Sequence, residues 1–147
     1  MITNPFDLQR FLDAQAPVYP LVLGELRAGR KQSHWMWFIF PQVAGLGQSA
    51  MAQRFAISSR EEAVAYLGHN VLGSRLQECT NRVNTVEGRT IREILGSPDD
   101  LKFHSSMTLF NAVSSDPEFA AAISKFYTGK RDQRTLDLLS RQPTRRT

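Results

Sequence analysis

Repeated start signals for α-helices constrain the fold of this chain more than any other feature of its sequence. Ser-Pro-Asp-Asp at residues 97–100 combines an N-cap residue, a first-turn proline and two acids that favour the positive end of a helix dipole. Asp-Pro-Glu at residues 116–118 repeats this pattern, and Asn4 followed by Pro5 is a third pair of cap and proline. The sequence therefore predicts helices joined by short breaks.

The other helix boundaries are marked by single cap residues. Gly29 stands where a helix C-cap is expected, Ser59 with Glu62 forms a capping box, and Asn70 is expected to open the helix that follows. Residues 33–40 are ambiguous between a buried strand and a short helix, and the helix is favoured because a lone strand has no partner. The expected helices cover residues 5–16, 20–28, 33–40, 49–55, 59–67, 70–83, 98–113, 119–128 and 131–139. This pattern predicts an all-α domain, a compact irregular bundle of about eight short helices.

The length and charge of the chain limit the classes of protein to which it can belong. The 147 residues are expected to form a single domain over residues 1–140, followed by a basic flexible tail over residues 141–147. No apolar run approaches the roughly 18 residues that cross a bilayer. Cys79 is the single cysteine, and a cytoplasmic protein without membrane insertion is expected. The net charge of +4 and the pI of about 9.6 favour a polyanionic partner such as nucleic acid, although a tail of this kind is more typical of a solubilising end.

The most distinctive part of the chain is the aromatic segment, KQSHWMWFIFPQVAGLGQS, which begins at Lys31. It contains both tryptophans, Trp35 and Trp37, and residues 26–60 around it contain no aspartate or glutamate. Large aromatic side chains are core residues by default, but one of the two tryptophans could instead stack on a planar ligand. The segment is thus aromatic and basic, with no acid of its own to neutralise it.

Three polar residues of the aromatic segment are candidate ligand contacts. His34 could donate a proton, stack on a ligand or hydrogen-bond within the core. Ser49 follows the glycines of GLGQS and begins a helix whose amides could face an anion, although a plain turn between helices explains the same pattern. Gln42 precedes this loop, and the loop's spacing matches no nucleotide-binding fingerprint.

A second basic face is expected on the helix after residue 98. Lys102, Ser105, Ser106 and Leu109 recur at helical spacing, so one lysine and two hydroxyls share a face. No acid occurs between residues 101 and 115. Lysine and serine together can hold a phosphate or a carboxylate, and the alternative is a solvated polar face.

Several chemistries find no support in the sequence. His34, His69 and His104 show no metal-ligand spacing, so neither a metal nor a cofactor is expected. The two basic segments contain no paired acids and the chain has no G-x-S-x-G motif, which argues against a two-carboxylate glycosidase and a serine hydrolase. A catalytic acid would have to come from elsewhere in the chain; the candidates are Asp7, Asp13, Glu25, Glu61 and Glu62.

Long strings of the sequence resemble one known family. FDLQRFLDAQAPVYPLVLGELRAG, GRKQSHWMWFIFPQVAGLGQSAMAQRFAI, EEAVAYLGHNVLGSRL and DDLKFHSSMTLF are similar to the bacterial and fungal family called domain of unknown function 1810. The resemblance implies a mainly α-helical single domain and no particular function. Members have been labelled calpastatin-like, a protease-inhibitor label that a short, non-repetitive chain does not support. The family's signature positions correspond to Lys31, His34, Trp35, Trp37, Pro41, Gln42, Gly47, Ser49, Lys102, Ser105, Ser106, Thr108 and Phe110.

Two functional hypotheses follow. The first is a pocket that binds a small anionic or nucleotide-like ligand, with or without catalysis, where the aromatic segment meets the Lys102 face. The second is a non-catalytic interaction module whose basic surface binds a protein or RNA partner. For the first hypothesis the expected ligand-binding residues are Lys31, His34, Trp35, Trp37, Gln42, Ser49, Lys102, Ser105 and Ser106.

Overall fold

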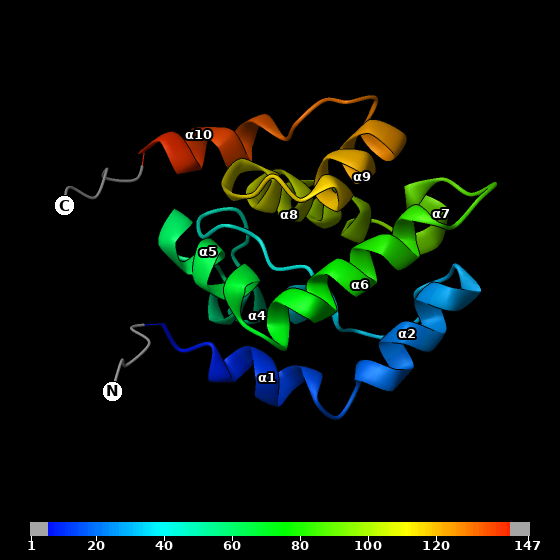
Figure 1. Cartoon of the computed structure of the whole chain (residues 1–147), viewed down its shortest axis with the longest axis horizontal. Coiled ribbons are helices and arrows are strands. Elements are labelled where there is room, and N and C mark those ends of the chain that lie inside the picture. Colours follow the sequence, from blue (N-terminus) through cyan, green and yellow to red (C-terminus); the bar gives the residue numbers. More distant parts are fainter. Residues whose placement is uncertain (1–5, 142–147) are drawn as a thin grey trace.

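The computed structural model describes residues 6–141 of the chain, and these residues form ten α-helices and no β-strand (Figure 1). The prediction of an all-α fold is confirmed, and the prediction of about eight helices was low. The helices are α1 (Gln9–Gln15), α2 (Tyr19–Ala28), α3 (Met36–Ile39), α4 (Ala50–Arg54), α5 (Arg60–Gly68), α6 (Leu72–Asn84), α7 (Ile91–Leu95), α8 (Asp99–Val113), α9 (Pro117–Tyr127) and α10 (Gln133–Arg141).

The helix that sequence reasoning missed is α7. Thr90 and Glu93 form a capping box there, with the Thr90 hydroxyl accepting from the Glu93 N–H and the Glu93 carboxylate accepting from the Thr90 N–H. The sequence carries this signal as T-x-x-E at residues 90–93. Asn70 was also wrongly assigned as the cap of α6, because the ring nitrogen Nδ1 of His69 accepts from the N–H groups of Val71 and Leu72 instead.

The cap expected at Ser97 is wrong, because Pro98 is the N-cap of α8 and no side chain caps that helix. Asp116 is the N-cap of α9 but makes no side-chain cap bond.

Three other cap signals act as expected. The Ser49 and Ser59 hydroxyls cap α4 and α5, each accepting from the backbone N–H three residues later. Gly29 ends α2 in the left-handed region at φ 75°. The expected cap at Asn4 and the segment 142–147 of the expected tail lie outside the described residues, while Arg141 is the last residue of α10.

Helix α8 carries the centre of the core. Figure 1 shows α1 and α2 along one edge of the molecule and α9 and α10 along the other, with α5, α6 and α8 between them. α8 packs against α5, α7, α9 and α10. Phe103 and Phe110 of α8 are fully buried; Phe103 meets Phe40 edge-on at 4.9 Å between ring centroids, and Phe110 lies 5.5 Å from Tyr66. Buried aromatic side chains supply much of the apolar area that stabilises a domain of this size.

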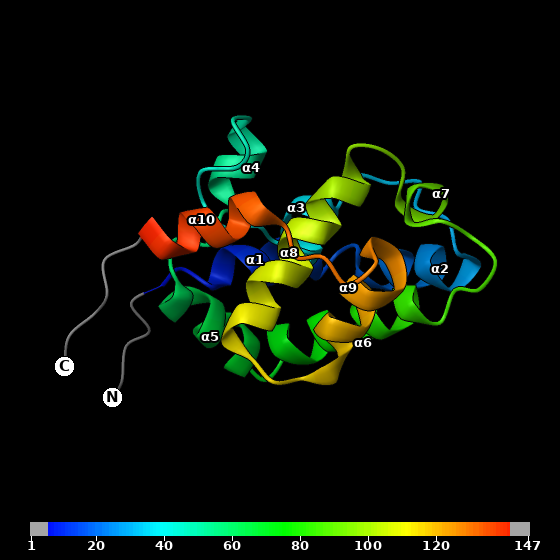
Figure 2. The ribbon, with the colours of Figure 1, turned by 90° about the horizontal axis from the view of Figure 1, so that it is seen from above.

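The aromatic segment forms a single helical turn, not a strand. α3 covers only Met36–Ile39, and Phe38, Ile39 and Phe40 on either side of its end are buried. The chain then continues through residues 41–49 to α4, which stands out from the body (Figure 2). None of the described helices is long and apolar enough to cross a membrane.

Candidate anion-binding site

The aromatic segment folds around an acid that its own sequence lacks. Glu25, on α2, is 8% exposed, and its carboxylate accepts hydrogen bonds from the N–H groups of Gln32 and Ser33 and from the indole of Trp35, at 2.8, 3.0 and 2.9 Å. The Ser33 hydroxyl donates a fourth. Burial alone raises the pKa of Glu25, but these hydrogen bonds outweigh burial, so the pKa lies below its usual value. An ionised carboxylate therefore neutralises this end of the segment.

A second acid, Asp99, lies close to both of the lysines that were expected to hold a ligand. Lys31 Nζ lies 2.8 Å from one carboxylate oxygen of Asp99, and Lys102 Nζ lies 3.7 Å from the other. The Lys31 side chain is only 7% exposed, and its ammonium also lies 5.0 Å from the centre of the Trp35 ring. Lys31 is thus a buried structural cation, whereas Lys102 is held more loosely.

Lys102 also covers the second tryptophan. Its Nζ lies 5.0 Å from the centre of the Trp37 ring, within the range of a cation–π contact. The Trp37 side chain is half-buried, and its Nε1 is buried without a hydrogen-bond partner among the described residues. The Trp37 ring is therefore in contact with the Lys102 ammonium group.

One cavity lies where the loop of the aromatic segment meets α8 and the start of α10. Its volume is about 360 Å³, within the range of small-molecule sites. It is hereafter the Lys102 pocket. Gln42, Leu46 and Gly47 line it from the loop, Lys102 and Ser105 from α8, and Arg134 from α10.

Close packing forms the loop side of the Lys102 pocket. A Cβ at Gly47 would lie 2.4 Å from the Cβ of Ala52, so only glycine lets the loop approach the first turn of α4 this closely. The backbone of Gln42 accepts a hydrogen bond from the Ile57 N–H at 2.8 Å, which ties the start of the loop to the segment after α4. The part of the loop that lines the pocket, residues 42–47, is therefore held in place at both of its ends.

A network around Asp132 forms the opposite side. One carboxylate oxygen of Asp132 accepts from the hydroxyl and the N–H of Thr135, at 2.6 and 3.2 Å, and from the Ser105 hydroxyl at 3.2 Å. The Asp132 N–H donates to the Thr108 hydroxyl at 2.9 Å. These bonds fasten the start of α10 to α8 and bring Arg134 to the pocket.

Sequence reasoning missed Arg134, Asp132 and the pocket-lining His104. The ring of His104 stacks on Tyr127 at 3.9 Å, and its Nε2 lies 2.6 Å from the carbonyl oxygen of Lys130, so this nitrogen carries the proton and donates. An N-cap signal at Asp132, just before the apolar spacing of α10, was available in the sequence. Nothing local indicated that α10 would dock beside Lys102.

The nine expected ligand-binding residues therefore do not all line one cavity. Gln42, Lys102 and Ser105 line the Lys102 pocket, and the other six are not part of its lining. His34 is exposed, Ser49 caps α4, and Ser106 is fully buried with its hydroxyl unpaired among the described residues. Trp35 is 1% exposed and its indole N–H is bound to Glu25. Residues 6–141 contain no group of three potential metal ligands close enough to hold an ion.

The fold and this cavity define a compact all-α domain with a small surface pocket lined by lysine and arginine. The chain belongs to the family described as "Protein of unknown function (DUF1810)", whose model matches residues 5–139. Its structure is similar to the crystal structure of the conserved hypothetical protein Rv1873 from Mycobacterium tuberculosis, with a TM-score of 0.93 and 58% sequence identity over 95% of this chain and 100% of that chain. No curated protein matches the chain. Neither description carries the calpastatin-like label.

Proposed function

We propose that the Lys102 pocket binds a small anionic ligand through Lys102 and Arg134. The observation that carries the proposal is that these two cations line one cavity of about 360 Å³ together with the polar side chains of Gln42 and Ser105. The cavity is also where the aromatic segment meets the Lys102 face, which is where the sequence predicts a site.

The ammonium group of Lys102 has hydrogen-bond donors to spare. Its 3.7 Å separation from Asp99 exceeds the 2.7–3.2 Å range of a hydrogen bond, and the closer carboxylate contact of Asp99 is to Lys31. Arg134 is exposed and forms no ion pair within the described part of the chain. A carboxylate or phosphate can therefore bind both cations without breaking an existing hydrogen bond.

The lining favours a ligand with one anionic group and a short apolar part. Leu46 and Leu101 contribute apolar surface, and Leu101 is 62% exposed. Asp132 adds one negative charge to the lining and offsets one of the two cations, so a ligand with a single anionic group matches the remaining positive charge. No aromatic ring other than the imidazole of His104 is among the described lining residues, so stacking with a nucleotide base is not part of the proposal.

The proposal is binding without catalysis. The groups in the pocket that could transfer a proton are His104 and Asp132, and each is already held by hydrogen bonds to neighbouring helices or loops. A cytoplasmic location belongs to the same proposal and rests on the single, buried cysteine, Cys79.

A thermal-shift screen tests the proposal. Inorganic phosphate, short-chain carboxylates, sugar phosphates, nucleotides and ADP-ribose are added to the wild type and to Lys102→Ala and Arg134→Ala. A ligand at 100 times its dissociation constant should stabilise the wild type by roughly 2.7 kcal/mol, or on the order of 8 °C. The shift should fall in both variants. Arg131→Ala is the matched control, because Arg131 is exposed and does not line the pocket.

Two results would reject the proposal: no shift with any ligand of the panel, or the same shift in Lys102→Ala as in the wild type. The alternative, a non-catalytic module that binds a protein or RNA, has less support in the described residues. The exposed large apolar side chains, Leu21, Val64, Val71 and Leu101, lie on different elements, and isolated exposed apolar residues are ordinary.

A further inference from the structure

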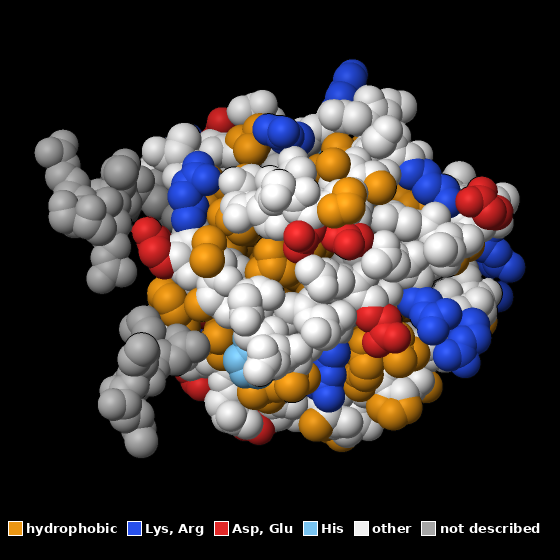
Figure 3. Space-filling view, viewed as in Figure 1, with side chains coloured by type: hydrophobic (Ala, Val, Ile, Leu, Met, Phe, Trp, Pro, Cys, Tyr) orange, Lys and Arg blue, Asp and Glu red, His pale blue; other side chains and the backbone are white. Residues whose placement is uncertain are grey.

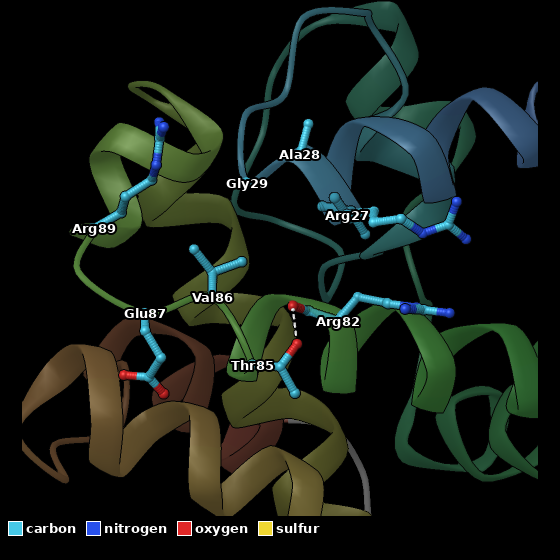
Figure 4. Close-up of a pocket in the computed structure, with 9 residues that line it drawn as sticks. Arg27, Ala28, Gly29, Arg82, Thr85, Val86, Glu87 and Arg89 are labelled. Carbon is cyan, nitrogen blue, oxygen red and sulfur yellow. Dashed lines mark hydrogen bonds between the residues drawn. The ribbon is translucent and has the colours of Figure 1, made fainter.

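A second cavity, of about 320 Å³, lies where the ends of α2 and α6 meet the loop that leads to α7 (Figure 4). Arg27 lines it from the last turn of α2, Arg82 from the last turn of α6 and Arg89 from the loop. It is hereafter the arginine pocket. Lys and Arg side chains gather at the same end of the molecule in the space-filling view (Figure 3).

Carbonyl groups at the two helix ends beside the pocket have hydrogen-bond partners other than these guanidinium groups. Lys125 of α9 donates to the carbonyl oxygens of Asn84 and Val86, the latter at 2.9 Å, and so satisfies the negative end of α6. At the end of α2, the Gly29 N–H donates to the Leu26 carbonyl at 3.0 Å. The arginines are therefore not explained as caps of their own helices.

Glu87 is the one acid among the described lining residues, and it is paired with Lys125. Glu87 Oε1 lies 3.1 Å from Lys125 Nζ, and in Figure 4 the Glu87 carboxylate points away from Arg27 and Arg82. Among residues 6–141, neither these two arginines nor Arg89 forms an ion pair with an acid. Three positive charges thus share one cavity with a single acid, Glu87, among its described lining residues, while Glu93 interacts electrostatically with Arg89.

The three guanidinium groups stand on two sides of the cavity. Arg27 and Arg82 extend in the same direction, and Arg89 extends from the other side of Val86 (Figure 4). The stem of Arg89 crosses the end of α2, where a Cβ on Gly29 would lie 3.6 Å from the Arg89 Cδ. A ligand that uses all three arginines must therefore carry more than one anionic group.

The lining also indicates what kind of anion fits. A guanidinium presents parallel N–H donors that match two oxygens of a phosphoryl group. No aromatic side chain is among the described lining residues, whereas sites for single-stranded nucleic acid use aromatic rings on which bases stack. Phosphoryl groups without a base are therefore favoured over an RNA strand.

We infer that the arginine pocket binds a short inorganic phosphate chain, with Arg27 and Arg82 holding a phosphoryl group at one end of the chain and Arg89 holding one at the other end. This inference is independent of the proposed function, because the arginine pocket and the Lys102 pocket share no lining residue. The ligand class also differs, since the Lys102 pocket is expected to take a singly anionic group.

The test is isothermal titration of the full chain with tripolyphosphate at fixed ionic strength. The double variant Arg27→Ala/Arg82→Ala should bind at least about tenfold more weakly than the wild type, because two charge-assisted contacts are lost. Arg27→Lys/Arg82→Lys keeps both charges and removes the forked donors, so its affinity should lie between those two. Lys102→Ala and Arg131→Ala should bind as the wild type does.

Each remaining outcome decides against the inference. Equal affinity in the wild type and the double alanine variant would exclude the arginines as the site. Equal binding of orthophosphate and tripolyphosphate would show that only one phosphoryl group is held. Tighter binding of a single-stranded RNA oligonucleotide than of tripolyphosphate, with loss in the same double variant, would assign the pocket to nucleic acid instead. Loss of tripolyphosphate binding in Lys102→Ala alone would move the site to the Lys102 pocket.

Discussion

Lys31 and Asp99 form an ion pair of 2.8 Å that joins the loop after α2 to the start of α8, with side chains 7% and 18% exposed. The backbone N–H of Lys31 also donates to the carbonyl oxygen of Ile94 at 2.7 Å. The two bonds hold the aromatic segment against the α7–α8 region. The pair therefore has a structural role, and it sets how much charge is left on Lys102.

Replacing the acid of this pair should destabilise the fold. Asp99→Asn leaves a nearly buried lysine without its carboxylate, and removing one partner of a buried ion pair costs about 3 kcal/mol. Urea denaturation followed by circular dichroism measures the loss. The control is Asp137→Asn, because the Asp137 carboxylate accepts only an exposed hydrogen bond from Gln133, and its effect should stay within about 0.5 kcal/mol. Equal midpoints for the two variants would contradict the structural role of the pair.

Replacing Glu25 should make stability depend less on pH. Glu25→Gln loses the charge that accepts four hydrogen bonds, so at pH 7 it should be less stable than the wild type by about 2 kcal/mol. The pKa of Glu25 is lowered from 4.5 by folding, so its contribution is full above pH 4.5 and is lost as the pH falls through the lower folded-state pKa.

The measurement for Glu25 is a series of urea midpoints between pH 7 and pH 3. The difference between the wild type and Glu25→Gln should be constant down to about pH 4.5 and shrink below it. A difference that stays constant through the acid range, or that grows as the pH falls, would contradict a lowered pKa.

Two buried hydroxyls on α8 should respond differently to removal. Ser106 is fully buried and its Oγ has no partner among the described residues, so Ser106→Ala should be neutral or stabilising by up to about 1 kcal/mol. Thr108 is equally buried, but its hydroxyl accepts from the Asp132 N–H at 2.9 Å. Thr108→Val keeps the shape and leaves that N–H unpaired, so it should cost about 1–2 kcal/mol.

Thermal unfolding of Ser106→Ala and Thr108→Val measures the change in stability of each variant. The ligand-induced thermal shift is a second measurement on Ser106→Ala. Ser106 does not line the Lys102 pocket, so Ser106→Ala should keep any ligand-induced thermal shift of the wild type. A large destabilisation by Ser106→Ala, with loss of that shift, would instead assign Ser106 a role in the site.

One substitution should have opposite effects at two helical glycines. Gly24 lies inside α2, is exposed, and a Cβ there would meet nothing within 4 Å, so Gly24→Ala should stabilise by about 0.5–1 kcal/mol through helix propensity. Gly73 of α6 is buried, and a Cβ there would lie 2.0 Å from the Leu67 carbonyl oxygen. Gly73→Ala should therefore destabilise by about 3 kcal/mol or more. Differential scanning calorimetry of both variants is the measurement, and shifts of the same sign would contradict this packing.

Helix boundaries were largely predictable because their signals lie within one turn of the residues they act on. Ser49, Ser59 and Gly29 each end or begin a helix through bonds to residues three or four positions away. Even the missed helix α7 carries such a signal in Thr90 and Glu93. The signal for α7 is thus as local as the signals for the other helices.

The candidate site was predictable only in part. Gln42, Lys102 and Ser105 were named from the sequence and line one cavity. The two basic segments contain no acid in sequence, but acids from elsewhere in the chain lie against them in the structure. Glu25 lies one residue before the acid-free stretch and accepts a hydrogen bond from the Trp35 indole. Asp99, at the start of α8, lies close to both Lys31 and Lys102.

The sequence by itself thus determined the all-α class and the helix ends at Ser49, Ser59 and Gly29, because caps and glycines act on neighbouring backbone groups. Only the tertiary structure decided which charges are free. Lys31 is neutralised by Asp99, whereas Arg134 reaches the Lys102 pocket because Asp132 fastens α10 to α8. Charge pairing depends on distances between helices, and those distances are set by how the core packs and not by spacing along the chain.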